Sequence, residues 1–199
     1  LGGDIPSEFK SWADELTAPV EAKKSSGEEV KKEKVQAGLA RGAVKAAKDG
    51  SPVISVSCDL QGSTGMGAFH KEFPERSFDI GIAGSNMVSC AAGMSKLGYI
   101  PIVDTFAAFG VTKGNLPLIM SSLSEAPMIA VFSHAGFQDA ADGASHQSLT
   151  YISAVSSIPN TKVVVPASSE EAEALMIQAI DEIETSRLDG RSGNSYIFF

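Results

Sequence analysis

The segment from Phe78 to Phe109 constrains the fold of this chain more than any other part of the sequence. An apolar run from Phe78 to Ile82 stops at the short turn Ala83-Gly84-Ser85-Asn86, and a second apolar run extends from Ile100 to Phe106. The residues between the turn and the second run are mostly small and are compatible with a helix. A strand, a turn, a helix and a strand within about thirty residues have the size of a βαβ unit. We therefore expect two parallel strands here.

The same alternation of apolar runs and helix-like segments continues on both sides of this unit. Strands are expected at residues 53–57, 78–82, 100–105, 128–132, 162–165 and 195–199. Helices are expected at 28–48, 86–97, 106–124 with an interruption near 114–117, 147–156 and 168–185. No hairpin turn joins two of the strands, which is typical of a parallel sheet whose faces are both covered. We predict an α/β fold with a mostly parallel six-stranded sheet and helices on both faces.

The first 27 residues differ from the rest of the chain. They combine prolines and glycines with only short apolar clusters, and one short helix is expected over 7–16. We predict a linker arm over residues 1–27 and one domain over residues 28–199. Because the sequence begins at Leu1 and ends on the apolar Phe199, we expect a piece of a longer chain or one half of a two-component enzyme.

Composition excludes several classes of function. Hydrophobic residues make up 43% of the sequence and charged residues 20%, as in soluble globular domains. A net charge of −8 argues against binding to nucleic acid or to anionic membranes. No apolar run approaches the ~20 residues that span a bilayer. The two cysteines are far apart and are expected to be free thiols in a reducing compartment, so we predict a cytoplasmic protein.

Functional side chains are expected at the carboxyl ends of the strands, near the point where the strand order reverses. The residues that directly follow each predicted strand are therefore the candidates. These residues are Asp59, Leu60 and Ser63 after the first strand, Gly84, Ser85 and Asn86 after the second, Phe106 and Phe109 after the third, and His134, Asp139, Asp142 and His146 after the fourth. Together they predict a small-molecule site with an aromatic wall and polar specificity groups.

Each of these features also has a simpler interpretation. The glycine-rich segment 62–67 matches neither of the common phosphate-binding loops and is compatible with a flexible loop. Phe106 and Phe109 have the spacing of helix core residues. His134 and His146 lack a cysteine or a third histidine that would complete a metal site, so no metal site is predicted. A serine hydrolase is disfavoured because no G-x-S-x-G turn follows a strand.

Five motifs follow one another along residues 35–199. They are Ser57-Cys58-Asp59-Leu60 with Ser63; Phe78–Ala83 with Asn86-Met87-Val88; Thr105–Phe109; His134–His146; and Ile158–Asn160 with Val165–Ser168. This order resembles the pyrimidine-binding domain of the transketolase family of thiamin diphosphate enzymes. The 1-deoxyxylulose-5-phosphate synthases share much of the pattern, and the β-type subunits of 2-oxo acid dehydrogenases are similar at a greater distance.

The resemblance implies a role for each matching residue. The cofactor-binding residues would be Asp59, Leu60, Ile82, Phe106 and Phe109, with the two phenylalanines packed on the aminopyrimidine ring. The substrate phosphate would meet Ser63 and His134. The catalytic set would be His134, Asp142 and His146, with Asp142 and His146 recognising sugar hydroxyls. Such enzymes transfer a two-carbon ketol unit between sugar phosphates, which places the family in carbohydrate metabolism.

The resemblance also implies partners. The cofactor diphosphate and its Mg²⁺ or Ca²⁺ would be held by a separate domain with a G-D-G motif, which this sequence lacks. A diphosphate-binding domain or subunit is therefore an expected partner, and this chain alone is predicted to be inactive. Family members dimerise across these domains, so we expect a homodimer, with the small-residue helix 86–97 as a candidate interface.

The sequence departs from the family at the turn after the second strand. The family has a glutamate-glutamine pair there, and this sequence has Gly84-Ser85. The glutamate bonds a pyrimidine nitrogen and activates the cofactor, and a serine hydroxyl is a far weaker proton partner. Neither Glu75, before the strand, nor Asp79, expected in mid-strand, is an obvious substitute, and Thr112 replaces a frequent aromatic. A non-catalytic family member with a structural or regulatory role is therefore the alternative.

Overall fold

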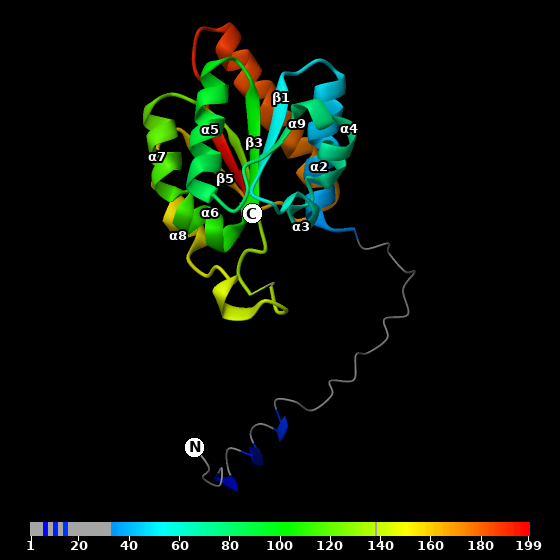
Figure 1. Cartoon of the computed structure of the whole chain (residues 1–199), viewed down its shortest axis with the longest axis vertical. Coiled ribbons are helices and arrows are strands. Elements are labelled where there is room, and N and C mark those ends of the chain that lie inside the picture. Colours follow the sequence, from blue (N-terminus) through cyan, green and yellow to red (C-terminus); the bar gives the residue numbers. More distant parts are fainter. Residues whose placement is uncertain (1–5, 8–9, 12–13, 16–32, 138) are drawn as a thin grey trace. The chain divides into compact units, whose positions relative to one another are not determined.

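The computed structural model describes residues 6–7, 10–11, 14–15, 33–137 and 139–199 (Figure 1). The chain divides into two units, Leu1–Lys32 and Glu33–Phe199, and the following description concerns the second. Most of the expected arm, including half of the short helix at 7–16, lies outside the described residues, as do the first five residues of the helix expected at 28–48.

A six-stranded parallel sheet forms the centre of the second unit (Figure 1). Its strands are β1 (Val53–Ser57), β2 (Ser77–Asp79), β3 (Ile100–Phe106), β4 (Ile129–Ser133), β5 (Thr161–Val164) and β6 (Ser195–Phe198). Their order across the sheet is β2-β1-β3-β4-β6-β5, and every neighbouring pair is parallel. The predicted α/β fold with a parallel six-stranded sheet is confirmed.

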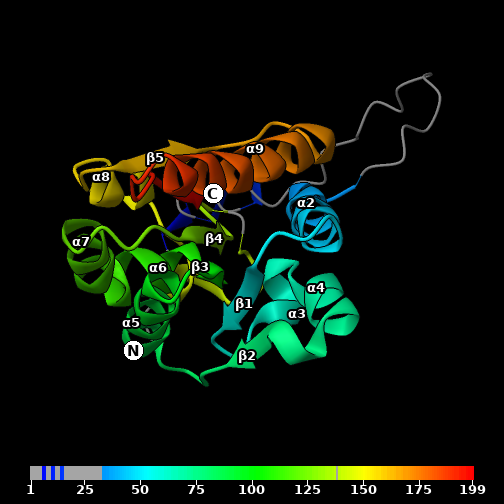
Figure 2. The ribbon, with the colours of Figure 1, turned by 90° about the horizontal axis from the view of Figure 1, so that it is seen from above.

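Helices cover both faces of the sheet (Figure 2). The helices are α2 (Val35–Lys48), α3 (Gln61–Thr64), α4 (Gly67–Glu72), α5 (Gly84–Lys96), α6 (Ala107–Lys113), α7 (Asn115–Leu123), α8 (Tyr151–Val155) and α9 (Ser169–Leu188), with 3₁₀ turns η1 (Pro74–Arg76) and η2 (Gly143–Ser145). One apolar core lies between the sheet and α2, α4 and α9, and the other lies between the sheet and α5 to α8. Within the described part of the chain, no helix is long and apolar enough to cross a membrane.

The helices α2 and α9 pack closely because α2 carries glycines on the face toward α9. A Cβ added at Gly38 would overlap the backbone oxygen of Ser169, and one at Gly42 would lie 2.8 Å from the backbone oxygen of Glu173. The predicted start of α9 is confirmed, since Ser168 is its N-cap and its hydroxyl accepts a hydrogen bond from Glu171 N.

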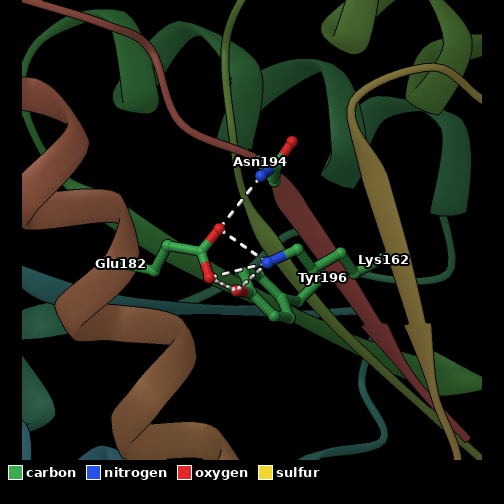
Figure 3. Close-up of polar contacts among 4 residues, drawn as sticks. All are labelled: Lys162, Glu182, Asn194 and Tyr196. Atoms are coloured by element: carbon green, nitrogen blue, oxygen red, sulfur yellow. Dashed lines mark hydrogen bonds and ion pairs between the residues drawn. The ribbon is translucent and has the colours of Figure 1, made fainter.

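A polar cluster ties α9 to the edge of the sheet (Figure 3). The Nζ of Lys162 lies 2.7 Å from both carboxylate oxygens of Glu182. Glu182 also accepts hydrogen bonds from the Tyr196 hydroxyl and, at 2.9 Å, from the Asn194 amide. These donors lower the pKa of Glu182 to about 2, with the Lys162 bond the largest cause. The cluster links β5, β6 and α9.

Several element boundaries differ from the sequence predictions. The strand expected at 78–82 is the three-residue β2, because Gly81 has φ +71° and breaks the extended conformation. Phe78 on the edge strand β2 is 39% exposed, and Ile82, which lies beyond Gly81 in the turn after β2, is 94% exposed. Helix α5 begins two residues before the expected position, and α8 is shorter than expected. The expected interruption between α6 and α7 is confirmed at Gly114.

Candidate ligand-binding site

A cavity of about 680 Å³ lies at the carboxyl ends of β1, β2 and β3. The strand order reverses at this point, because β1 is followed in sequence by a neighbour on one side, β2, and then by one on the other side, β3. Ligands of open α/β sheets bind in such positions. The lining comes from residues 58–60 after β1, 82–86 after β2, Thr105, Phe109 and Lys113 from β3 and α6, and His146.

The segment after β1 is held in a strained conformation. Asp59 has φ +60°, which is uncommon for a residue other than glycine. The carboxylate of Asp79 stabilises this arrangement, since its Oδ1 accepts hydrogen bonds from Asp59 N at 3.1 Å and Gly81 N at 2.7 Å. Asp79 is the last residue of β2, not a mid-strand residue as expected. Strain of this kind is concentrated at functional sites.

The turn after β2 contributes no ionisable group to the cavity. Gly84 is the first residue of α5, and Ser85 follows it. The Ser85 hydroxyl donates a hydrogen bond to the backbone oxygen of Lys113, so its only proton is engaged within the protein. Lys113 lies directly beside Gly84, because a Cβ added at Gly84 would be 3.4 Å from the Lys113 Cβ.

Aromatic rings form a stacked group at the cavity. The Phe106 and Phe109 rings are nearly parallel with centroids 6.1 Å apart, and Phe109 meets His146 edge-on at 5.2 Å. Phe109 lines the cavity, whereas Phe106 is buried behind it and packs on His134 at 4.2 Å. The core interpretation of the sequence therefore fits Phe106, and the cavity-wall interpretation fits Phe109.

A second cavity of about 580 Å³ lies beside α2 and α3 and includes Ser63 and His134 in its lining. Like Asp59, His134 follows a strand with positive φ, +58°. The cavity also includes Lys34 and Arg41, and Arg41 is paired with Glu33 and Glu173 at 2.6 and 2.8 Å. The two side chains that the resemblance assigns to a phosphate therefore line one cavity.

The loop between β4 and α8 brings only some of its predicted residues to these cavities. His146 lines the first cavity and His134 the second. Asp142 is exposed and lines neither cavity. Its backbone N–H donates a hydrogen bond to Asp139 Oδ1. Within the described ranges no group of three or more His, Cys, Asp or Glu side chains could hold a metal ion.

A buried carboxylate behind the first cavity was not predicted from the sequence. Asp104 lies on β3, is fully buried, and its Oδ2 accepts hydrogen bonds from Ser57 Oγ at 2.9 Å and Thr64 Oγ1 at 2.5 Å. Burial, opposed by these two hydrogen bonds, raises the pKa of Asp104 to about 6. A charged residue inside an apolar strand was the available sequence signal. Asp104 does not line the cavity itself.

The fold and the cavity define an α/β ligand-binding domain that holds an aromatic-lined pocket at a topological switch point. Residues 32–187 match the family described as transketolase, pyrimidine binding domain. The match covers most of the chain, and the chain belongs to this family.

Individual relatives agree with this assignment. The chain is 32% identical over 137 residues to the 1-deoxy-D-xylulose-5-phosphate synthase of Syntrophus aciditrophicus, covering 69% of this chain and 21% of that protein. It is 38% identical over 117 residues to the putative transketolase C-terminal section of Methanocaldococcus jannaschii, covering 57% of this chain and 36% of that protein. The chain thus spans between a fifth and somewhat over a third of these two curated relatives.

Solved structures show the same fold. A split gene transketolase, described as an inactive β4 tetramer, superimposes with a TM-score of 0.67 at 28% identity over 82% of this chain and 50% of that chain. The transketolase of Leishmania mexicana superimposes with a TM-score of 0.63 at 18% identity over 85% of this chain and 26% of that chain.

Proposed function

We propose that this chain is the pyrimidine-binding part of a thiamin diphosphate-dependent enzyme that transfers a two-carbon ketol unit between sugar phosphates. The observation that carries the proposal is the cavity at the switch point of the sheet, with Phe109 and His146 in its wall. A planar aminopyrimidine ring fits an aromatic-lined cavity of this size. When bound, the cofactor would supply the electron sink for carbon–carbon bond chemistry. Leu60 and Ile82 would provide the apolar contacts beside Asp59.

The neighbouring groups suit a sugar phosphate substrate. Ser63 and His134 would bind its phosphate, which is supported by their shared position on the second cavity. His146 would meet the hydroxyl beside the reacting carbonyl, because it stands at the first cavity. Asp142 would recognise another hydroxyl, and its exposed position requires that the substrate extend outward from the cavity.

The active site would be completed by a partner. The cofactor diphosphate and Mg²⁺ would be held by a diphosphate-binding domain or subunit, and we expect the complex to act in cytoplasmic carbohydrate metabolism. We also propose self-association, with α5 as the contact, since its exposed face carries Ser89 and Gly93. The neighbour described as a β4 tetramer supports association between copies of such chains.

The alternative is a non-catalytic member with a structural or regulatory role. Gly84 and Ser85 favour it, because the cavity lacks the acid that activates the cofactor in the family. Lys113 adds a basic side chain next to this position, since its Cβ would lie 3.4 Å from a Cβ at position 84. A positioned acid contributes ~10²–10⁴-fold to a proton transfer, so we expect the native chain to be slower than its relatives by a factor in this range.

The test is to restore the acid. Gly84→Glu needs no repacking, because the new Cβ meets only Lys113 Cβ at an ordinary 3.4 Å and Gly84 does not have a positive φ. A salt bridge to Lys113 would lower the pKa of the new carboxyl and weaken its proton exchange with the ring. We therefore expect Gly84→Glu with Lys113→Ala to transfer ketol units faster than Gly84→Glu alone.

The measurements combine calorimetry with thiamin diphosphate and Mg²⁺ and a ketol-transfer assay, both with a diphosphate-binding transketolase subunit. Gln178→Glu is the control, because it adds a carboxylate at an exposed position of another helix, α9, that lines neither cavity and lies outside the proposed contact on α5. Binding without any gain of transfer in either the single Gly84→Glu variant or its combination with Lys113→Ala would refute the account of position 84. Absence of binding by every form would favour the structural role.

A further inference from the structure

Asp104 accepts hydrogen bonds from both ends of the segment that separates the two cavities. The segment starts after Ser57, the last residue of β1, and ends at Thr64, the last residue of α3. The hydroxyls of both residues reach the same carboxylate oxygen, Oδ2 of Asp104, at 2.9 and 2.5 Å. Residues 58–63 are therefore closed into a loop by one side chain of the neighbouring strand.

The loop carries residues of both cavities. Asp59 and Leu60 line the first cavity, and Ser63 lines the second. The same two hydroxyls also contact the backbone of Leu60. Its N–H donates a hydrogen bond to Ser57 Oγ at 3.4 Å, and its carbonyl oxygen lies 3.0 Å from Thr64 Oγ1. The Thr64 hydroxyl has one proton, which it donates to the closer and charged acceptor, the Asp104 carboxylate. Hydrogen bonds to a charged acceptor are roughly twice as strong as neutral ones.

We propose that Asp104 is a positioning residue that sets the geometry of the 58–63 loop and, through it, the binding of ligand in both cavities. The assignment of ligand binding to these cavities rests on the proposed function, whereas the closing of the loop does not. Asp104 acts through Ser57 and Thr64 and touches no ligand itself, since it lines neither cavity.

A purely packing role is inconsistent with the chemistry at this position. An apolar residue would fill the same buried space on β3 without desolvating a carboxylate, and replacing buried charges by apolar groups is often neutral or stabilising. The second oxygen, Oδ1, is buried and without a hydrogen-bond partner among the described residues. A carboxylate is therefore unfavourable to bury as a core-filling group, but it can accept hydrogen bonds from two hydroxyls.

The first experiment measures the loop without any ligand. Amide hydrogen exchange across residues 58–65 is followed by mass spectrometry in the wild type, Asp104→Ala and Thr64→Val. Loss of a hydrogen bond to a charged group corresponds to a change of about tenfold or more in local opening, so we expect exchange to rise by that factor. Ser121→Ala is the matched control, because it removes a buried hydrogen bond to Ala126 O in another part of the fold.

A double variant separates positioning from general destabilisation. If Thr64 acts through Asp104, Asp104→Ala with Thr64→Val should exchange no faster across 58–65 than Asp104→Ala alone. Thr64→Val keeps the shape of the side chain and removes only the donor, so it answers the question even if Asp104→Ala does not fold. Exchange that rises equally over the whole chain, or independent effects that multiply, would overturn the proposal.

The second experiment measures ligand binding in the complex with a diphosphate-binding subunit. We expect Thr64→Val to weaken thiamin diphosphate about tenfold, and to weaken it less below the pKa of Asp104, where the carboxyl is protonated. Among the described residues, Asp79 on β2 and the Cys58 thiol are the ionisable groups that interact with this carboxyl, and both are unchanged in the variant. Faster loop exchange with no binding by any form supports the positioning and refutes the proposed function. Wild-type affinity in Thr64→Val refutes the positioning.

Discussion

Replacing Asp104 by asparagine should change the way the stability of the protein depends on pH. Burial raises the pKa of Asp104 from its ordinary 3.8 to about 6, because the charged form is poorly solvated inside the sheet. An acid with a raised pKa binds its proton more tightly in the folded state than in the unfolded state. The wild type is therefore most stable, as far as this group is concerned, below pH 3.8, and loses stability as the pH rises through about 6.

The size of the effect follows from the shift. A difference of about two pKa units corresponds to ~3 kcal/mol in the free energy of unfolding once the carboxyl is fully ionised. Asparagine keeps an oxygen that can accept from Ser57 or Thr64, and it has no charge to desolvate. Any effect of its amide group on packing is the same at every pH. We expect the stability of Asp104→Asn relative to wild type to rise by ~2–3 kcal/mol between pH 4 and pH 8.

The assay is urea unfolding of both proteins at a series of pH values. Subtracting the two curves removes the other titrating groups, including His70, whose pKa is lowered by burial. Asp181→Asn is the control, since it makes the same chemical change at an exposed position on α9. A difference between wild type and Asp104→Asn that stays constant from pH 4 to pH 8 would show that Asp104 is not a desolvated carboxylate.

Two further outcomes are expected from the packing of α9. Gly38→Ala should destabilise the protein by about 1–3 kcal/mol, because the new Cβ meets the backbone oxygen of Ser169. Gly93→Ala is the comparison at an exposed helix position with open space, and it should stabilise the protein by about 0.5–1 kcal/mol. Equal shifts of the thermal melting temperature in the two variants would refute this account of the close approach. Glu182→Gln should lower the free energy of unfolding by about 1–2 kcal/mol at pH 7. This is less than the wild-type Glu182 pKa of about 2 would suggest, because the side chain is 28% exposed and solvent screens its ion pair. The depressed pKa means that wild type loses this stability as the pH falls below 4.5 toward 2, so a difference that persists at pH 2 would contradict the role of the Lys162 ion pair.

The sheet was predictable because its pattern is local. Each buried strand is an apolar run of its own, and the absence of hairpin turns fixes the parallel direction. The edge strand was not predictable in the same way, since the apolar run at Phe78 and Ile82 looks like a core strand. Only the strand order shows that β2 lies at the edge and leaves Phe78 exposed, and only the structure shows that Ile82 lies in the turn after the strand.

The cavity was predictable from strand ends, but its supports were not. Asp59, Leu60, Ile82, Phe109 and His146 follow their strands directly, and parallel strands bring such residues to one edge. By contrast, the hydrogen bonds to Asp104 come from residues 47 and 40 positions away in sequence, so no spacing pattern in the sequence predicts them. Lys113 ends α6, and a lysine at the end of a helix normally indicates only a solvated position.

The supports of the site and the residue at position 84 lead to different conclusions about the same site. Asp59 and His134 adopt strained backbone conformations, and Asp104 is a desolvated charge beside the cavity. A domain that served only as a scaffold would be more stable without these features, so they favour a site that binds a ligand in a defined geometry. Gly84 adds no ionisable group to this site, and a Cβ added there would meet only the Lys113 Cβ, at 3.4 Å. The arrangement is therefore that of a site shaped to hold a ligand in a defined geometry, and position 84 is the place on its wall where a side chain could be added to act on that ligand.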